Sequence, residues 1–177
     1  MNKVTTLLAL VLFAVCSAQA QDELPITGYP AARDVPNAKM LPDPNRELKV
    51  VFDAAAAAEN VDDVNPMLVA VARYVNTLAK YGVPQDKRKI AVVMHQGATP
   101  IILKNDEFKA RYDGHDNPNI DLIRQLNAAG VAFHVCGQGA TAQKIAPEDI
   151  LDEVQLDLWA LTTIIDLGMQ GYVKIGG

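Results

Sequence analysis

Short apolar runs alternate along this chain with segments of helical periodicity, and this alternation constrains the fold more than any other feature. Residues 89–95 read Lys-Ile-Ala-Val-Val-Met-His, without the polar alternation of a strand that has one exposed face. A strand of this kind is typically buried on both faces, as in parallel sheets covered by helices. The alternation therefore predicts right-handed crossovers and an α/β domain with a largely parallel sheet.

The same patterns place the individual elements. Strands are expected at Glu47–Asp53, Lys89–His95, Val131–Cys136, Val154–Trp159 and Tyr172–Ile175. Helices are expected between Asn65, which can cap, and Gly82, which can stop, and then over Asn119–Ala129 and Ala160–Met169. A short helix or turn is expected over Ala140–Ala146, followed by a possible helix start at Pro147–Leu151.

The first 20 residues have the pattern of a cleavable export signal. Lys3 supplies a weak positive charge, Leu7–Val15 is apolar, and Ala18 and Ala20 are small residues at the expected cleavage site. A lipoprotein signal ending at Cys16 is an alternative, but Val15 stands where such signals usually carry a small residue. We therefore expect a periplasmic protein with no membrane span, because no later apolar run is long enough to cross a bilayer.

Residues 21–46 are rich in proline and polar side chains, and their apolar residues follow neither the periodicity of a helix nor that of a strand. They are expected to form a linker or an extended arm, which could lie across a neighbouring subunit. Residues 47–177 then form one ordinary domain. The formal net charge of −5 argues against nucleic acid as a partner.

Three reactive side chains end the first three expected strands: Asp53, His95 and Cys136. Ligands of open parallel sheets collect at the carboxyl ends of the strands, so we expect these three residues to share one edge and form the catalytic group. Cleavage of the signal would leave Cys136 as the one cysteine of the exported protein. An unpaired thiol in an oxidising compartment suggests reactivity.

The surroundings of Cys136 supply candidate supporting residues. A helical turn starting near Gly139 would present backbone N–H groups that favour an anion beside the thiol. His134 projects to the same strand face as Cys136, either as a neighbour of the thiol or as a hydrogen-bonded core histidine. The remaining supporting residues are expected to be Gln96, Gly137 and Gln138.

Other chemistries are less well supported. Cys136 could be an inert buried residue. It could instead be the nucleophile of a Cys136–His95–Asp53 hydrolase, although no nucleophile elbow surrounds it. Cysteine and histidine also bind metals, but no CxxC or HxxxH spacing is present, and Gly137-Gln-Gly139 lacks the rest of a phosphate loop. We therefore expect neither a metal nor another cofactor.

The residues also carry a family resemblance. With His-Gln-Gly-Ala-Thr at 95–99 after the second strand and His-Val-Cys-Gly-Gln at 134–138 in the third, the chain resembles the DsrE/DsrF-like family over residues 47–175. The resemblance implies a three-layer α/β/α sandwich around a five-stranded parallel sheet, assembled into trimers or hexamers. The apolar segment Leu158–Met169 also favours a homo-oligomer.

The resemblance further implies a role for Cys136. In the sulfur-oxidising members a cysteine after a central strand accepts sulfur as a persulfide, and Cys136 matches its position. The partner would then be a small sulfur species or a sulfur-donor protein. Those members are cytoplasmic and work with partner subunits, whereas this sequence predicts an exported protein. The alternative is a non-catalytic oligomeric binding module with a structural cysteine.

Overall fold

Five parallel strands form the central sheet of the structure, a computed structural model that describes residues 24–176. The strands are β1 (Leu48–Ala54), β2 (Arg88–Met94), β3 (Val131–Cys136), β4 (Val154–Asp157) and β5 (Val173–Gly176). They lie in the order β4-β3-β2-β1-β5, so that β4 and β5 are the edges. The predicted α/β class and five-stranded parallel sheet are confirmed.

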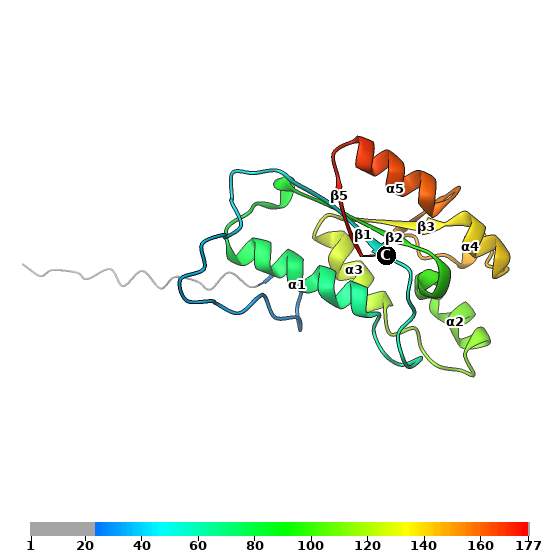
Figure 1. The fold of residues 1–177 in the computed structure, drawn as a ribbon. Helices are drawn as coiled ribbons and strands as arrows, with labels where there is room; N and C mark the ends of the chain where they lie inside the picture. The colour runs from blue at the N-terminus through cyan, green and yellow to red at the C-terminus, as the bar shows by residue number, and fades with distance from the viewer. Residues whose placement is uncertain (1–23, 177) are drawn as a thin grey trace, which may run out of the picture.

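Helices cover both faces of this sheet unequally (Figure 1). Helices α1 (Pro66–Lys80) and α3 (Ile120–Ala128) pack against one face and bury the larger apolar core. Helix α5 (Ala160–Met169) lies on the opposite face over a smaller cluster. The three-layer sandwich is therefore confirmed, with one thin outer layer that leaves part of the second sheet face accessible.

The first helix begins and ends where its sequence predicts. The Asn65 side chain accepts a hydrogen bond from the backbone N–H of Met67 at 2.9 Å, and Pro66 occupies the first turn, where its missing N–H is not needed. The chain leaves the helix through Gly82, whose φ of 76° is readily adopted only by glycine. These local signals mark both helix ends, and the backbone N–H of Asn65 also donates to Oδ1 of Asn119 at 2.8 Å, which ties the start of α1 to the start of α3.

Two elements between β2 and α3 were not predicted. The 3₁₀ segment η2 (Gln96–Ile102) follows β2 directly, and helix α2 (Asn105–Arg111) follows it. Gly97 and Pro100 within η2 are residues typical of loops, and α2 is too short for its periodicity to be recognised. Of the two, η2 contributes Gln96 to the cavity that contains Cys136, whereas no residue of α2 lines that cavity.

Three boundaries also differ from the sequence-based expectation. Helix α4 (Gly137–Ala142) begins immediately after β3 instead of near residue 140. Strand β4 ends at Asp157, because the chain then turns and uses Trp159 as the residue preceding α5. The expected helix start at 147–151 is the 3₁₀ turn η3 (Pro147–Asp149), and a second turn, η1 (Gln85–Lys87), precedes β2.

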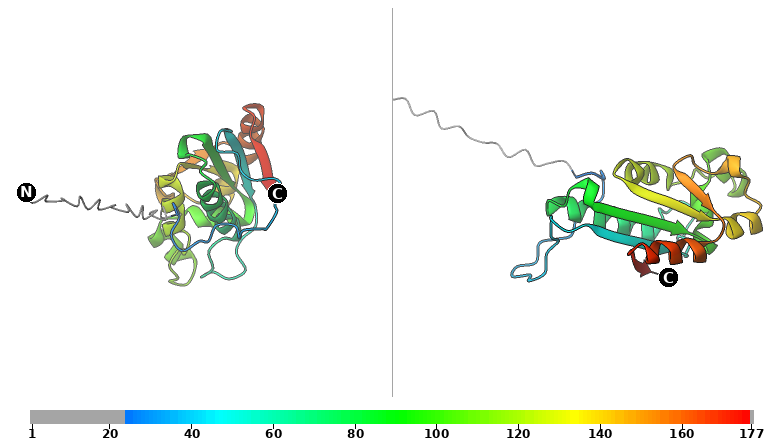
Figure 2. Two further views of the ribbon diagram at one scale, coloured as in Figure 1. Left: turned by 90° about the vertical axis from the view of Figure 1, so that its left-hand side faces the viewer. Right: turned by 90° about the horizontal axis from the view of Figure 1, so that it is seen from above.

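The proline-rich segment packs on its own domain at one end. Ile26 is almost fully buried, and the side chain of Asn76 in α1 bonds to its backbone N–H at 2.9 Å and to its carbonyl at 2.7 Å. Further along, Met40 is 93% exposed. Figure 2 shows this later part of the segment as a loop that projects beyond the helices. The segment is thus an arm anchored at α1, with a protruding tip.

The predicted export signal, including Cys16, lies outside the described residues. Within residues 24–176, no helix is both long and apolar enough to span a bilayer.

Candidate functional site

The parallel register brings the three predicted catalytic residues to one edge of the sheet. Strands β1, β2 and β3 are neighbours, as the sequence analysis assumed. Met94 pairs with Val135, so the next residues, His95 and Cys136, lie side by side just beyond the last paired position. Asp53 pairs with Val93 at the adjacent end of β1. All three side chains therefore lie at the carboxyl end of the sheet.

These side chains line a cavity of about 540 Å³ on the α5 face. The strand ends provide its floor, while α4 and the start of α5 form its walls. It is lined by Asp53, His95, Gln96, Cys136, Gln138, Gly139, Ala142, Gln143, Trp159, Ala160, Leu161, Ile164 and Lys174. Of the eight residues predicted for the site, the cavity thus contains Asp53, His95, Cys136, Gln96, Gln138 and Gly139.

Asp53 is the centre of a polar cluster in this cavity. Its Oδ1 lies 2.5 Å from Nε2 of His95, and its Oδ2 accepts a hydrogen bond of 2.7 Å from Nζ of Lys174. The carboxylate is almost fully buried, whereas the Lys174 side chain is 47% exposed. Both carboxylate oxygens thus have a basic partner, and one of these partners reaches solvent.

The balance of these effects keeps Asp53 ionised. Burial alone would raise its pKa, but the hydrogen bonds from Lys174 and His95 outweigh burial, and the pKa lies below its usual value. An acid with a lowered pKa stabilises the folded state at neutral pH, and this contribution is lost as the pH falls through the folded-state pKa. With the carboxylate ionised, Nε2–H of His95 donates to Asp53, so Nδ1 is the ring nitrogen that takes no part in this pair.

Cys136 lies at the floor of the cavity with only 4% of its surface exposed. It packs in the apolar cluster beneath α5 with Val51, Val93 and Ala160. It is also the residue that precedes the first turn of α4. The thiol is therefore held between an apolar cluster and a solvent-connected cavity, and approach to it leads through that cavity.

Two glycines allow the surrounding chain to close around Cys136. A Cβ atom on Gly137 would lie 2.5 Å from the backbone oxygen of Asp157, so only glycine lets the β4–α5 connection pass this closely. A Cβ atom on Gly139 would lie 3.0 Å from Oγ1 of Thr99, a buried hydroxyl with no hydrogen-bond partner among residues 24–176. Gly137 thus supports the site from outside the cavity, by packing.

The glutamines tie the rim of the cavity together. The Gln138 amide donates to the backbone oxygen of Leu158 at 3.3 Å and so links α4 to the connection before α5. The Gln143 amide donates to the backbone oxygen of Gln96 at 3.1 Å. Gln96 has a φ of 50°, an uncommon backbone conformation for a side-chain-bearing residue, at the turn from β2 into η2. These contacts hold α4 between the two segments that flank it.

His134 shares a strand face with Cys136 but lines a different cavity. Its Nδ1 lies 2.9 Å from Oδ2 of Asp157, which also accepts a hydrogen bond from Thr163 of α5. Burial alone would raise the pKa of Asp157, but hydrogen bonds from Gln155 and Thr163 and the proximity of His134 outweigh it, so the pKa is lowered. His134 therefore joins β3 to α5 through Asp157 and does not line the cavity of Cys136.

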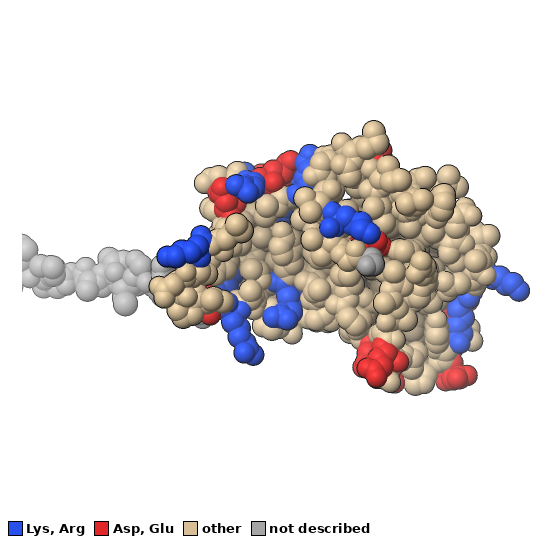
Figure 3. All heavy atoms as spheres, viewed as in Figure 1, with Lys and Arg blue, Asp and Glu red and all other residues tan. Residues whose placement is uncertain are grey.

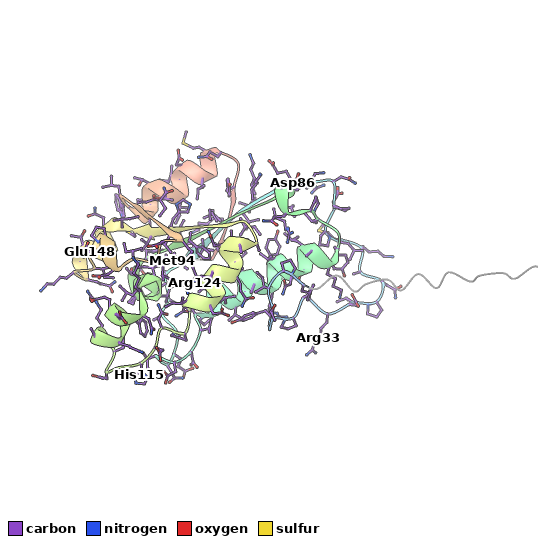
Figure 4. All side chains as sticks on the ribbon, turned by 180° about the vertical axis from the view of Figure 1, so that it is seen from behind. Arg33, Asp86, Met94, His115, Arg124 and Glu148 are labelled. Atoms are coloured by element: carbon purple, nitrogen blue, oxygen red, sulfur yellow. The ribbon has the colours of Figure 1, made fainter. Side chains whose placement is uncertain are left out.

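The third histidine, His115, lies apart from both cavities. Its Nδ1 is 2.7 Å from Oδ1 of Asp62 in an exposed pair. Figure 4 places it at the outer edge of the molecule, away from Met94 at the end of β2. Among residues 24–176, no three His, Cys, Asp or Glu side chains are arranged to hold a metal ion.

Lys174 and Trp159 are the main site residues that sequence reasoning missed. Lys174 lies within the predicted last strand, but it reaches Asp53 because β5 pairs with β1, and no local pattern reveals that pairing. Trp159 was placed inside the fourth strand, whereas it stands in the turn before α5 and lines the cavity. The one signal in the sequence was that Lys174 is a charged residue within a short, otherwise apolar strand, which could have indicated a role in the site.

Comparison with known proteins agrees with this architecture. The model of the DsrE/DsrF-like family matches residues 42–175, which is most of the chain. The chain belongs to the DsrE/DsrF-like family. A search of curated proteins found no significant match to this chain.

Two solved structures share the fold of this DsrE/DsrF-like chain. One is MTH1491 of Methanobacterium thermoautotrophicum, described as a protein of unknown function, with 18% identity over 72% of this chain and 97% of its own and a TM-score of 0.51. The other is the ychN protein of E. coli, with 15% identity over 72% of this chain and 96% of its own and the same TM-score. At these identities the similarity establishes the fold.

We expect Gly137→Ala to destabilise the protein by about 1–3 kcal/mol, because the added methyl group forces the Asp157 backbone away from α4. Gly168→Ala in α5 is the matched control, since its added Cβ meets open space, and it should be neutral or gain up to about 1 kcal/mol. Urea unfolding at one fixed protein concentration measures both. Equal stability of Gly137→Ala and wild type would contradict the close approach.

Proposed function

We propose that this DsrE/DsrF-like protein carries sulfur as a persulfide on Cys136. The observation that supports this most strongly is the position of the thiol at the floor of a cavity that also contains the Asp53–His95 pair. A carrier of this kind needs one thiol, and Cys136 is the one cysteine among residues 24–176. The proposal includes export to the periplasm, which leaves Cys136 as the one thiol of the exported protein.

The chemistry is a displacement at sulfur. The Cys136 thiolate attacks the outer sulfur of a persulfide or polysulfide, a new S–S bond forms on Sγ, and the S–S bond of the donor breaks. A persulfide donor leaves as a thiolate and a polysulfide donor as a polysulfide anion shortened by one sulfur; either takes up a proton, so no external oxidant or reductant is required. Return of the sulfur to an acceptor thiol is the same step in reverse.

His95 is the group that moves the proton in this proposal. Asp53 binds Nε2 and orients the imidazole, and no hydrogen bond within residues 24–176 involves Nδ1. Nδ1 can therefore take the proton of the Cys136 thiol, directly or through a water molecule in the cavity, and return it to the leaving thiolate. This arrangement follows the general logic of a nucleophile, a base and a group that orients the base.

Treatment with inorganic polysulfide should add one sulfur atom to Cys136, detected by mass spectrometry of the alkylated Cys136 peptide. His95→Ala should slow this addition roughly a hundredfold, as expected for loss of a general base. His115→Ala is the matched control, because His115 also pairs with an aspartate but lies in an exposed loop. Absence of sulfur on Cys136, or equal slowing by both substitutions, would contradict the proposal.

The second candidate is a non-catalytic binding module of the same fold. The burial of Cys136 and its packing against Val51 and Ala160 favour this alternative, in which the cysteine serves as part of the small core. The polysulfide experiment separates the two candidates, because a purely structural cysteine stays unmodified in the folded protein.

We also propose that the protein forms a homo-oligomer, a trimer or a hexamer, through the surface around α5. Large apolar side chains are exposed on α5 and on the connection that precedes it, namely Leu158, Trp159, Leu161, Ile165 and Met169. In Figure 3 the surface over α5 consists mainly of uncharged residues. A contiguous apolar surface beside an exposed edge strand typically marks an interface. A second copy on this surface would lie beside the mouth of the Cys136 cavity.

Ile165→Asp should convert the oligomer to smaller species, because it places a charge in the proposed interface, where Ile165 is 54% exposed. Met40→Asp in the protruding arm is the control, since Met40 is more exposed but lies outside the α5 surface. Light scattering at micromolar concentration gives the masses. A wild-type protein that is already monomeric would refute the oligomer.

A further inference from the structure

The cavity around Cys136 is divided into a polar and an apolar side. On the polar side, Asp53 lies near the end of β1, His95 follows β2, and Lys174 lies within β5. On the other side, Trp159 and Leu161 stand at the start of α5, and about half of each side chain is exposed. A bare sulfide chain is a small anion, and an apolar wall of this kind contributes nothing specific to its binding.

The size of the cavity also exceeds the needs of an inorganic donor. Its volume of about 540 Å³ lies within the range of roughly 300–1,000 Å³ that is typical of sites for small organic molecules. A persulfide group that reaches Cys136 at the floor would fill a small part of that space. The remainder would surround an organic group attached to the donor sulfur.

Lys174 gives the cavity a preference for an anionic group. It is the one lysine or arginine among the lining residues, and one of its ammonium hydrogens is used by Asp53. Because the Asp53 side chain is 6% exposed and the Lys174 side chain 47% exposed, the cavity presents the ammonium more than the carboxylate. The two remaining N–H groups can bind a carboxylate of the donor.

We infer that the physiological sulfur donor of this site is the persulfide of a small organic thiol that carries a carboxylate. The carboxylate binds Lys174, the organic part packs on Trp159 and Leu161, and the terminal sulfur reaches Cys136. The thiolate of Cys136 attacks that sulfur, the S–S bond of the donor breaks, and the organic thiolate leaves with a proton. This inference rests on the proposed persulfide chemistry of Cys136 and adds the class of donor.

The experiment compares glutathione persulfide, cysteamine persulfide and inorganic polysulfide as donors to Cys136. Each initial rate is divided by the rate of the same donor with free cysteine, which removes differences in intrinsic reactivity. For wild type we expect glutathione persulfide, which has carboxylates, to exceed cysteamine persulfide, which has none, by tenfold or more, as expected for a charge-assisted hydrogen bond.

Substitutions then assign the preference to residues. Lys174→Met should reduce the ratio of glutathione persulfide to cysteamine persulfide about tenfold. Lys174→Arg should retain the ratio, because it keeps the charge. Lys89→Met is the matched control, since Lys89 lies in β2 outside the cavity, and it should leave the ratio unchanged. Trp159→Ala should lower the rate with glutathione persulfide relative to polysulfide, because the organic part loses its apolar wall.

The outcomes separate this inference about the donor from the proposed persulfide function of Cys136 on which it rests. Equal relative rates for the two organic persulfides, or a Lys174→Met variant with an unchanged ratio, would overturn the assignment of the donor while Cys136 still accepts sulfur from polysulfide. Failure of every donor to modify Cys136 would overturn the persulfide function and the donor class together.

Discussion

The shared register of β1, β2 and β3 is the constraint on which the rest of the site depends. Parallel pairing brings three strands to an end at the same edge. Asp53 and His95, which are 42 positions apart in the sequence, therefore become neighbours, and so do His95 and Cys136, which are 41 positions apart. A slip of one residue would move every side chain to the opposite face and would place Asp53 and His95 against the larger apolar core, so the difference between the two faces fixes this register. The chemistry of Cys136 thus depends on strand pairing more than on any local motif.

Asp53 then connects the site to the last part of the chain. Its carboxylate binds His95 on one side and Lys174 on the other, so the short edge strand β5 is held by an ion pair as well as by its hydrogen bonds to β1. The Lys174 and His95 interactions lower the pKa of Asp53 despite its burial. One buried carboxylate therefore orients the histidine and places a positive charge at the mouth of the cavity.

The thin outer layer of the sandwich explains why this edge is open. Helices α1 and α3 cover one sheet face closely, whereas α5 alone covers the other. Its first turn contributes Trp159 and Leu161 to the cavity, while Asp157 and Thr163 tie it to His134. The same helix is thus both a wall of the site and the centre of an exposed apolar surface, which links access to Cys136 with the proposed assembly.

Sequence reasoning recovered the parts of this structure that local patterns encode. Buried apolar runs predicted the strands, and Asn65 and Gly82 predicted the ends of α1. Strand ends predicted that Asp53, His95 and Cys136 would meet. The contribution of Lys174 to the site was not predicted, because it depends on the long-range pairing of β5 with β1. The separate environment of His134 was not predicted for a similar reason, since Asp157 and α5 create it.

The reactivity of native Cys136 toward small alkylating reagents tests the central claim most directly. The rates with neutral iodoacetamide and anionic iodoacetate are measured for the folded protein and compared with those of free cysteine. A reactive thiol in a cavity that presents Lys174 predicts alkylation of the folded protein, with iodoacetate favoured relative to iodoacetamide when compared with free cysteine. Cys136 that reacts only after unfolding would contradict the account and identify a structural core residue.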